Sequence, residues 1–233
     1  MIEAQRRLVR PMLAPTDPAD AMTAYFALKH SPQRTKLFLH RGPGERVDGF
    51  VGVCRTGRNL FVPLVVLRSS PGNVDDLLRE ALVPGRPYEL VVPEELYVTV
   101  ARSIKTDRWQ LYRVYVLEAS AYRPVLNAMV QPGQRPFRYE IRIRDQVVAA
   151  AGLNWHSDQM ADMYVEVASE SQGRGWGKAV GSACVRDALS ARLLPLYTVA
   201  DDNVASQRLA ESLGFRDSGV CEYSCVGTLG PAN

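Results

Sequence analysis

The chain has 233 residues, of which 46% are hydrophobic and 23% are charged, and its formal net charge is +3. This balance is typical of a folded globular protein and excludes long disordered stretches. The net charge is too small to indicate a nucleic-acid partner, and no apolar run approaches the roughly 20 residues of a membrane helix. We therefore expect neither a nucleic-acid nor a membrane partner. The N-terminal sequence lacks the apolar core of a signal peptide, which predicts a cytoplasmic location.

The first half of the sequence predicts alternating strands and helices. Asp17 and Pro18 are typical of a helix start, as N-cap and first helical residue. Strands are expected at 36–40, 47–54, 59–67, 88–92 and 111–117, and further helices at 73–82 and 93–104. Pro63 indicates a bulge or an edge in the third of these strands. Asn73 is a candidate N-cap for the helix that follows it.

The same order of elements begins again after Ala121. Strands are expected at 137–143, 147–154, 161–167, 194–200 and 220–226, and helices at 176–191 and 203–213. Gly214 ends the second helix. Each half therefore reads strand, strand, strand, helix, strand, helix, strand. We predict two similar domains, 1–121 and 122–233, although a single mixed sheet of many strands would give the same pattern.

A glycine cluster distinguishes the second half from the first. Residues 172–177 read Gln-Gly-Arg-Gly-Trp-Gly and lie between a predicted strand and a predicted helix. The first amides of a helix have no intrahelical partner, and glycine lets a ligand approach the backbone, so this loop can bind a phosphate group. It is not a dinucleotide fingerprint, because Lys178 stands where the third glycine should be, and it lacks the spacing of a Walker loop.

Two segments resemble one known family. Residues 172–177 resemble the Q/R-x-x-G-x-G/A signature of the GNAT acyltransferase superfamily, and residues 203–215, NVASQRLAESLGF, are similar to the second segment of that family. The close resemblance covers 164–215, and the strand pattern extends it to 137–226. It implies a mixed α/β sheet in which acyl-coenzyme A lies between two splayed parallel strands, here 164–167 and 194–200. The first half is expected to be a degenerate GNAT-like copy without the cofactor loop.

The resemblance also implies which residues bind acetyl-CoA. We expect backbone groups of two strand residues, a row of loop residues and two helix residues to hold it. These are, in that order, Val165 and Val167; Gln172, Gly173, Arg174, Gly175, Trp176, Gly177 and Lys178; and Asn203 and Ser206. Asn203 can also be a plain N-cap. The Trp176 side chain is expected to pack in the core while its backbone binds the ligand.

Chemistry in the family is direct attack of an amine on the thioester, which needs a base and a donor for the oxyanion. Glu166 is our candidate base, because strand alternation turns it away from its valine neighbours; a solvated carboxylate is the alternative. Tyr164 shares its face and is the second catalytic candidate. A backbone N–H near Val167 would serve the oxyanion. The tyrosine that often protonates the leaving thiolate is replaced by Ala210.

With Ala210 at this position, either Ser206, Tyr197, Tyr223 or water donates the proton to the thiolate, or catalysis is impaired. Three functions stay open: an N-acetyltransferase acting on a small-molecule or peptide amine, a non-catalytic acyl-CoA sensor, and an unrelated α/β phosphate binder. Ala210 favours the second, and the paired motifs argue against the third.

No metal is expected, because the cysteines and histidines match no zinc pattern. Exposed sheet edges would allow a homodimer.

The second half has little sequence available for helices before its second strand. Only residues 123–130 could supply one. We therefore expect the N-terminal half to build part of the acceptor pocket.

Overall fold

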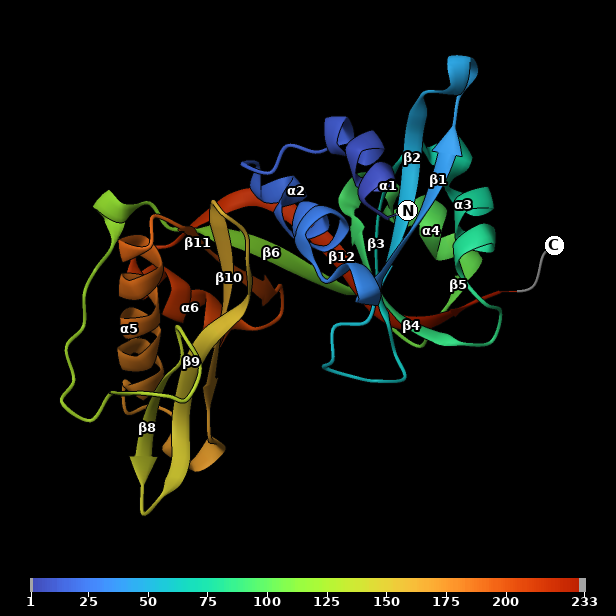
Figure 1. The fold of residues 1–233 in the computed structure, drawn as a ribbon. Helices are drawn as coiled ribbons and strands as arrows, with labels where there is room; N and C mark the ends of the chain where they lie inside the picture. The colour runs from blue at the N-terminus through green and yellow to red at the C-terminus, as the bar shows by residue number, and fades with distance from the viewer. Residues whose placement is uncertain (1, 231–233) are drawn as a thin grey trace. The chain divides into compact units, whose positions relative to one another are not determined.

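The structure is a computed structural model that describes residues 2–230 (Figure 1). The chain divides into two units. The first unit contains the residues up to Tyr112 together with those from Cys221 onward, and the second contains Arg113–Val220. A single cut after Ala121 does not describe this division, because the end of the last strand belongs to the first unit.

The first unit is a sheet with helices on both faces. Its elements are α1 (Ile2–Val9), α2 (Pro18–Ala24), β1 (Thr35–Arg41), β2 (Val47–Cys54), β3 (Leu64–Ser69), α3 (Val74–Ala81), β4 (Pro87–Pro93), α4 (Tyr97–Ser103) and β5 (Ile104–Lys105). The strand order is β1-β2-β3-β4-β12, where β12 is Arg216–Leu229. One core cluster, with Val9 and Phe50, lies under α1 and α2, and a second, with Leu77 and Leu90, lies under α3 and α4.

The second unit is a sheet with helices packed on one face. Its elements are β6 (Gln110–Val116), β7 (Gln131–Pro132), β8 (Tyr139–Ile143), β9 (Gln146–His156), β10 (Met160–Val167), α5 (Trp176–Ser190), β11 (Leu194–Ala200) and α6 (Val204–Leu213). The strand order is β6-β11-β10-β9-β8-β7. Helices α5 and α6 share one core with the sheet (Figure 1). Residues 123–130 form no helix, so within the described part of this unit only a 3-10 turn at Ala119–Ala121, and no α-helix, precedes β8.

The two units repeat one arrangement, which confirms the expected tandem α/β fold. Each has three antiparallel strands, a helix, a parallel strand and a second helix. In each, the parallel pair is bonded over only three positions. In the first unit these run from Leu64↔Glu89 to Val66↔Val91, and in the second from Met160↔Leu194 to Asp162↔Leu196. Both units therefore contain a splayed parallel strand pair.

The last strand of each repeat belongs to the other unit. Strand β6 follows the helices of the first repeat, yet from Arg113 onward it lies in the second unit, next to β11. Strand β12 follows α6, yet from Glu222 to Thr228 it pairs with β4 in the first unit. Each sheet is therefore completed by residues from the other half of the sequence.

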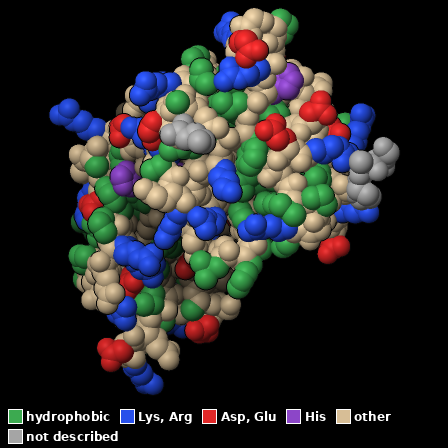
Figure 2. Space-filling model, turned by 45° about the vertical axis from the view of Figure 1, so that its right-hand side comes forward, with side chains coloured by type: hydrophobic (Ala, Val, Ile, Leu, Met, Phe, Trp, Pro, Cys, Tyr) green, Lys and Arg blue, Asp and Glu red, His purple; other side chains and the backbone are tan. Residues whose placement is uncertain are grey.

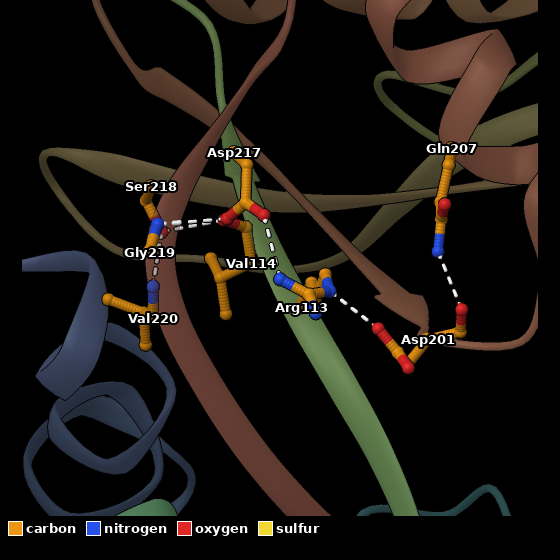
Figure 3. A network of polar contacts seen from close by, with 8 residues as sticks. All are labelled: Arg113, Val114, Asp201, Gln207, Asp217, Ser218, Gly219 and Val220. Atoms are coloured by element: carbon orange, nitrogen blue, oxygen red, sulfur yellow. Dashed lines mark hydrogen bonds and ion pairs between the residues drawn. The ribbon is translucent and has the colours of Figure 1, made fainter.

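A polar network fixes β6 within the second unit (Figure 3). The guanidinium of Arg113 pairs with Asp201, which precedes α6, and with Asp217 at 3.2 Å, near the start of β12. The Ser218 hydroxyl donates to the carbonyl of Val114 at 2.6 Å. The strand supplied by the first repeat is thus bonded to both elements that flank it at this end.

Most expected elements are present, and the differences have local causes. The strand expected at 59–67 starts only at Leu64, because Pro63 has no N–H to donate and Asn59 forms a turn by accepting from the amide of Phe61. Asn73 makes no cap bond; its side-chain amide lies 3.5 Å from Asp48 instead. Helix α1 was not predicted, because its buried residues include Arg6, which donates to the carbonyl of Ala27.

The strand exchange predicts which fragments fold. We expect residues 110–220 to give a cooperatively folded protein and residues 122–220 to give none. The shorter fragment lacks β6 and so exposes the β11 edge and loses the buried side chains Val114, Tyr115 and Val116. Thermal unfolding followed by near-UV circular dichroism distinguishes them. A sharp transition for 122–220 would show that β6 is dispensable.

Candidate functional site

Strands β10 and β11 separate soon after they begin. Their parallel pairing ends at Asp162↔Leu196, whereas β10 continues to Val167 and β11 to Ala200. On its other edge β10 stays paired with β9 as far as Val167↔Ala149. The opening therefore lies between the carboxyl ends of the two parallel strands.

The open edge of β10 presents backbone groups of two valines. The amide of Ala168 donates to the carbonyl of Val148 on the β9 side, at 2.9 Å. Successive residues of a strand direct their N–H and C=O groups to opposite edges. Those of Val165 and Val167 are therefore directed toward β11, where the pairing has ended. A half-buried strand edge of this kind needs other hydrogen-bond partners.

A buried carboxylate marks the point of separation. Asp162 is 6% exposed and is the last residue of β10 that pairs with β11. It accepts from the side-chain amide of Asn154 on β9 at 2.7 Å and from the hydroxyl of Thr198 on β11 at 3.0 Å. The pairing of β10 with β9 also shifts register immediately after it. Asp162 thus joins all three strands where two of them diverge.

The glycine loop presents a row of backbone amides. Gly173 and Gly175 have φ of +75° and +73°, and a Cβ on either would meet no atom within 4 Å. Their glycine identity is therefore required by backbone conformation and not by crowding. Within residues 2–230, the N–H groups of Gly173 through Lys178 have no acceptor, whereas the amide of Gln172 donates to Ser169 at 3.4 Å. Such a row can bind an anion.

Two other glycines set the position of α5. A Cβ at Gly177 would lie 3.0 Å from Val167 Cγ2, and one at Gly181 would lie 3.3 Å from Val165 Cγ2. Helix α5 therefore packs closely on β10 and runs antiparallel to it. Its N-terminal amides lie at the carboxyl end of β10, where the strands have separated, as ligand sites in parallel α/β sheets do.

The other predicted cofactor residues lie in the loop and at the start of α6. Arg174 lies with its guanidinium carbon 5.0 Å from the ring centroid of Trp176, which is 9% exposed and belongs to the core. Lys178 is half-buried. Asn203 follows the carboxyl end of β11 and caps α6, since its Oδ1 accepts from the amide of Ser206 at 3.0 Å. Gln207 steadies the same turn by donating to the carbonyl of Asp201 at 2.8 Å (Figure 3).

The two predicted catalytic residues lie on the opposite face of β10. Val165 and Val167 face α5, so alternation directs Tyr164 and Glu166 away from it. Glu166 is exposed and has no hydrogen-bond or ion-pair partner in the part of the chain that the structure describes. The Tyr164 ring covers Gly152, where a Cβ would lie 2.8 Å from the phenolic oxygen, and this oxygen accepts from Arg138.

A buried ion-pair network shares that face, and the sequence analysis missed it. Glu140 is 5% exposed and contacts Arg138 Nε at 2.6 Å and Arg142 Nη2 at 2.8 Å. The hydrogen bond from Arg138 holds the pKa of Glu140 below its ordinary value, although burial acts to raise it. Glu140 and Glu166 pair with the same residue of β9, Ala150, from its two sides. The alternation of charged and apolar residues along 138–142 is the sequence pattern that could have indicated this network.

The position at which the resemblance places a proton-donating tyrosine is occupied by a core residue, Ala210. Ala210 is 0% exposed and packs with Leu213 and Phe215. Of the alternatives, Tyr223 stacks on Tyr97 in the first unit at 3.8 Å between centroids. Tyr197 follows the last paired residue of β11; burial raises its pKa, and a hydrogen bond with Ser206 lowers it. Cys184 is fully buried, which raises the pKa of its thiol to about 12 and excludes a nucleophilic role.

Two further properties concern ions and membranes. Among residues 2–230, no group of three or more His, Cys, Asp or Glu side chains is placed to hold a metal ion. No helix in the described chain is both long and apolar enough to cross a membrane. On the face drawn in Figure 2, Lys and Arg side chains are spread out with Asp and Glu among them, in keeping with a net charge of only +3.

Comparison with known families and structures agrees with this geometry. Residues 135–225 match the family model of GNAT acetyltransferase. A GCN5-related N-acetyltransferase-like protein from Streptococcus suis 89/1591 superimposes with a TM-score of 0.65 at 12% identity, covering 96% of this chain and 99% of its own. A GCN5-related N-acetyltransferase from Kribbella flavida gives 0.63 at 15% identity, with 91% and 96% covered.

A tandem GNAT protein from the clavulanic acid biosynthesis pathway gives a TM-score of 0.60 at 13% identity, covering 100% of this chain and 95% of its own. A search of curated proteins gave no match. The fold of the chain is thus that of GCN5-related N-acetyltransferases, and one neighbour that spans it is a tandem. The match of residues 135–225 to the GNAT acetyltransferase model confirms the resemblance drawn from the two motifs.

The ion pairs of Glu140 predict how stability depends on pH. The Glu140→Gln variant is expected to lose about 1–3 kcal/mol of stability at pH 7. Because the pKa of Glu140 is lower in the folded state, its contribution is complete above its ordinary pKa of about 4.3 and is lost as the pH falls through the folded value. The difference between wild type and variant should therefore shrink in acid. Urea unfolding at several pH values measures it.

A matched control is available for this experiment. Glu118 pairs with Arg216 at 2.7 Å, but their side chains are 57% and 68% exposed. We expect Glu118→Gln to cost less than about 1 kcal/mol at any pH. Equal losses for the two variants would contradict the role given to the buried network.

Proposed function

We propose that the chain is an N-acetyltransferase that transfers an acetyl group from acetyl-CoA to a primary amine within a ternary complex. One observation carries this proposal. The free amides of Gly173 through Lys178 and the open backbone edge of Val165 and Val167 lie at the same end of the β10–β11 pair. A ligand with an anionic diphosphate joined to a chain of amides matches both sets of groups.

We assign partners to two parts of acetyl-CoA, its diphosphate and its pantetheine arm. The loop amides would bind the diphosphate, with Arg174 and Lys178 adding charge. A helix dipole contributes only about 0.3–1 kcal/mol per charge, so the amide hydrogen bonds supply most of the binding. The pantetheine amides would pair with Val165 and Val167 as an added strand does. Asn203 and Ser206 would bind the arm from the start of α6.

The chemistry follows from which groups lie on each side of β10. Acetyl-CoA supplies an activated thioester. Glu166, on the face opposite α5, would accept the proton of the incoming amine, whose nitrogen forms the new bond to the acetyl carbon as the carbon–sulfur bond breaks. A backbone N–H near Val167 would stabilise the oxyanion. Tyr164, held by Arg138, is the second candidate for proton transfer on this face.

The departing thiolate needs a proton, and we propose Tyr197 as its donor. It lies on β11 directly beyond the last paired residue, and burial, the largest influence, raises its pKa, so its hydroxyl is protonated at neutral pH. Ser206, at the start of α6, is the second candidate donor. Tyr223 is less suitable, because it stacks on Tyr97 in the first unit.

The glycine loop predicts a binding defect with a clear control. Gly175→Ala and Gly85→Ala both place a Cβ at positive φ, +73° and +76°, with no atom within 4 Å. Each should lose about 1–2 kcal/mol of stability. Only Gly175→Ala should also weaken binding of acetyl-CoA, about tenfold or more, since it displaces the amide row. Isothermal titration measures this.

The same protein tests the choice of ligand. Acetyl-CoA at about 100 times its Kd should stabilise the wild type by about 2.7 kcal/mol, and ATP and NAD should do so far less. Equal stabilisation by all three would favour a general phosphate-binding loop and overturn the proposal.

Replacement of Glu166 tests the base. Glu166→Gln should lower kcat by about 10²–10⁴ with little change in the affinity for acetyl-CoA. Glu170→Gln is the control, because Glu170 is also exposed and follows the end of β10. Thiol release in the presence of an amine library gives the rate. Unchanged turnover in Glu166→Gln would leave Glu166 as a solvated carboxylate.

A second function is favoured by one observation. Ala210 is fully buried where the resemblance places a catalytic tyrosine, which suits a protein that binds acyl-CoA without transferring the acyl group. The two functions differ in one result. A sensor would bind acetyl-CoA and lose affinity in Gly175→Ala, yet release no thiol with any amine.

A further inference from the structure

The first unit contains a pocket that lies away from its splayed strands. Its volume is about 390 Å³, within the usual range of about 300–1,000 Å³ for small-molecule sites. Its lining includes Pro63, just before β3, and Tyr88, near the start of β4. The parallel pair is bonded at those ends and separates at the others. The pocket therefore lies at the opposite end of the strand pair from the position that corresponds to the acetyl-CoA site of the second unit.

Four cationic side chains line this pocket, and the strand register brings three of them together. The amide of Arg55 donates to the carbonyl of Arg34, so these two arginines lie side by side, one directly before β1 and the other directly after β2. Lys36 lies on β1 opposite Val53, and all three cations line the same pocket. Like charges directly opposite each other on a sheet are destabilising. The fourth cation, Arg86, enters from the turn before β4.

No acidic group in the described chain forms an ion pair with these cations. Arg55 donates to the carbonyl of Gln33 at 3.0 Å, and Arg86 lies 5.6 Å from the ring centroid of Tyr88. The rim also holds the Glu80 carboxylate and the C-terminal end of α3, both of which disfavour an anion. Four cations against one carboxylate still leave the site strongly positive.

The floor of the pocket is apolar. Phe38 and Val53 pack against the core under α3, and Leu82 and Tyr88 are 3% and 2% exposed. A bare inorganic ion would leave this surface in contact with water. We propose that the pocket binds a small organic anion, phosphorylated or carboxylated, whose apolar body lies on Phe38 and Val53 while its charged group contacts Arg34, Lys36 and Arg55.

The test compares matched charge-removal variants of the full chain. Arg34→Gln with Lys36→Gln removes two exposed charges at the pocket, and Arg102→Gln with Lys105→Gln removes two exposed charges elsewhere in the first unit. Isothermal titration at fixed ionic strength uses phenyl phosphate, phenylacetate, inorganic phosphate and phenol. We expect at least one of the aromatic anions to bind the wild type. Its affinity should be about tenfold or more lower for the pocket variant, and within about twofold of the wild-type value for the control variant.

The remaining arms decide the chemistry. Phenyl phosphate and phenylacetate distinguish a phosphorylated from a carboxylated ligand, and inorganic phosphate and phenol should both bind more weakly. The proposal fails if neither aromatic anion binds, if the pocket and control variants behave alike, or if inorganic phosphate binds as tightly as phenyl phosphate. It also fails if Gly175→Ala, and not the pocket variant, abolishes binding, because the anion would then occupy the loop of the second unit.

Discussion

The constraint on which the second unit depends is the early end of hydrogen bonding between β10 and β11. A backbone edge left without partners is costly when buried, and it persists only if a structure enforces it. Here the Asp162 carboxylate binds Asn154 and Thr198 on the two neighbouring strands at the last paired position. The buried Asp162 carboxylate therefore fixes the point at which the strands separate, so the opening exists before any ligand arrives.

Glycines serve two different purposes around this opening. Gly173 and Gly175 adopt positive φ in open space, which exposes the amides that follow them. A Cβ at Gly177 or Gly181 would press on the valines of β10, so glycine at both positions allows α5 to approach the strand closely. The first pair shapes the surface for a ligand, and the second places that surface beside the open strands. A motif that reads as one run of glycines therefore combines a binding requirement with a packing requirement.

Much of the fold could be predicted from the sequence, because strand alternation and helix signals are local. Asp17 and Gly214 mark helix ends as their chemistry requires. The loop was identified because spacing along the chain places glycines at a helix start. The exchange of β6 and β12 could not be predicted, because either strand fits either sheet by pattern alone. The networks around Glu140 and Asp162 depend on strand register, which one sequence does not specify.

The exchanged strands also bear on how the protein is made. The sheet of the first unit needs β12 from Glu222 to Thr228, which the ribosome synthesises near the end of the chain. The β4 edge of the first unit therefore has no partner strand until the whole second repeat has been synthesised. Domains usually fold in order during synthesis, but here the first unit is completed only after the second repeat has been made. The nascent first repeat is then the species most exposed to aggregation and most dependent on chaperones.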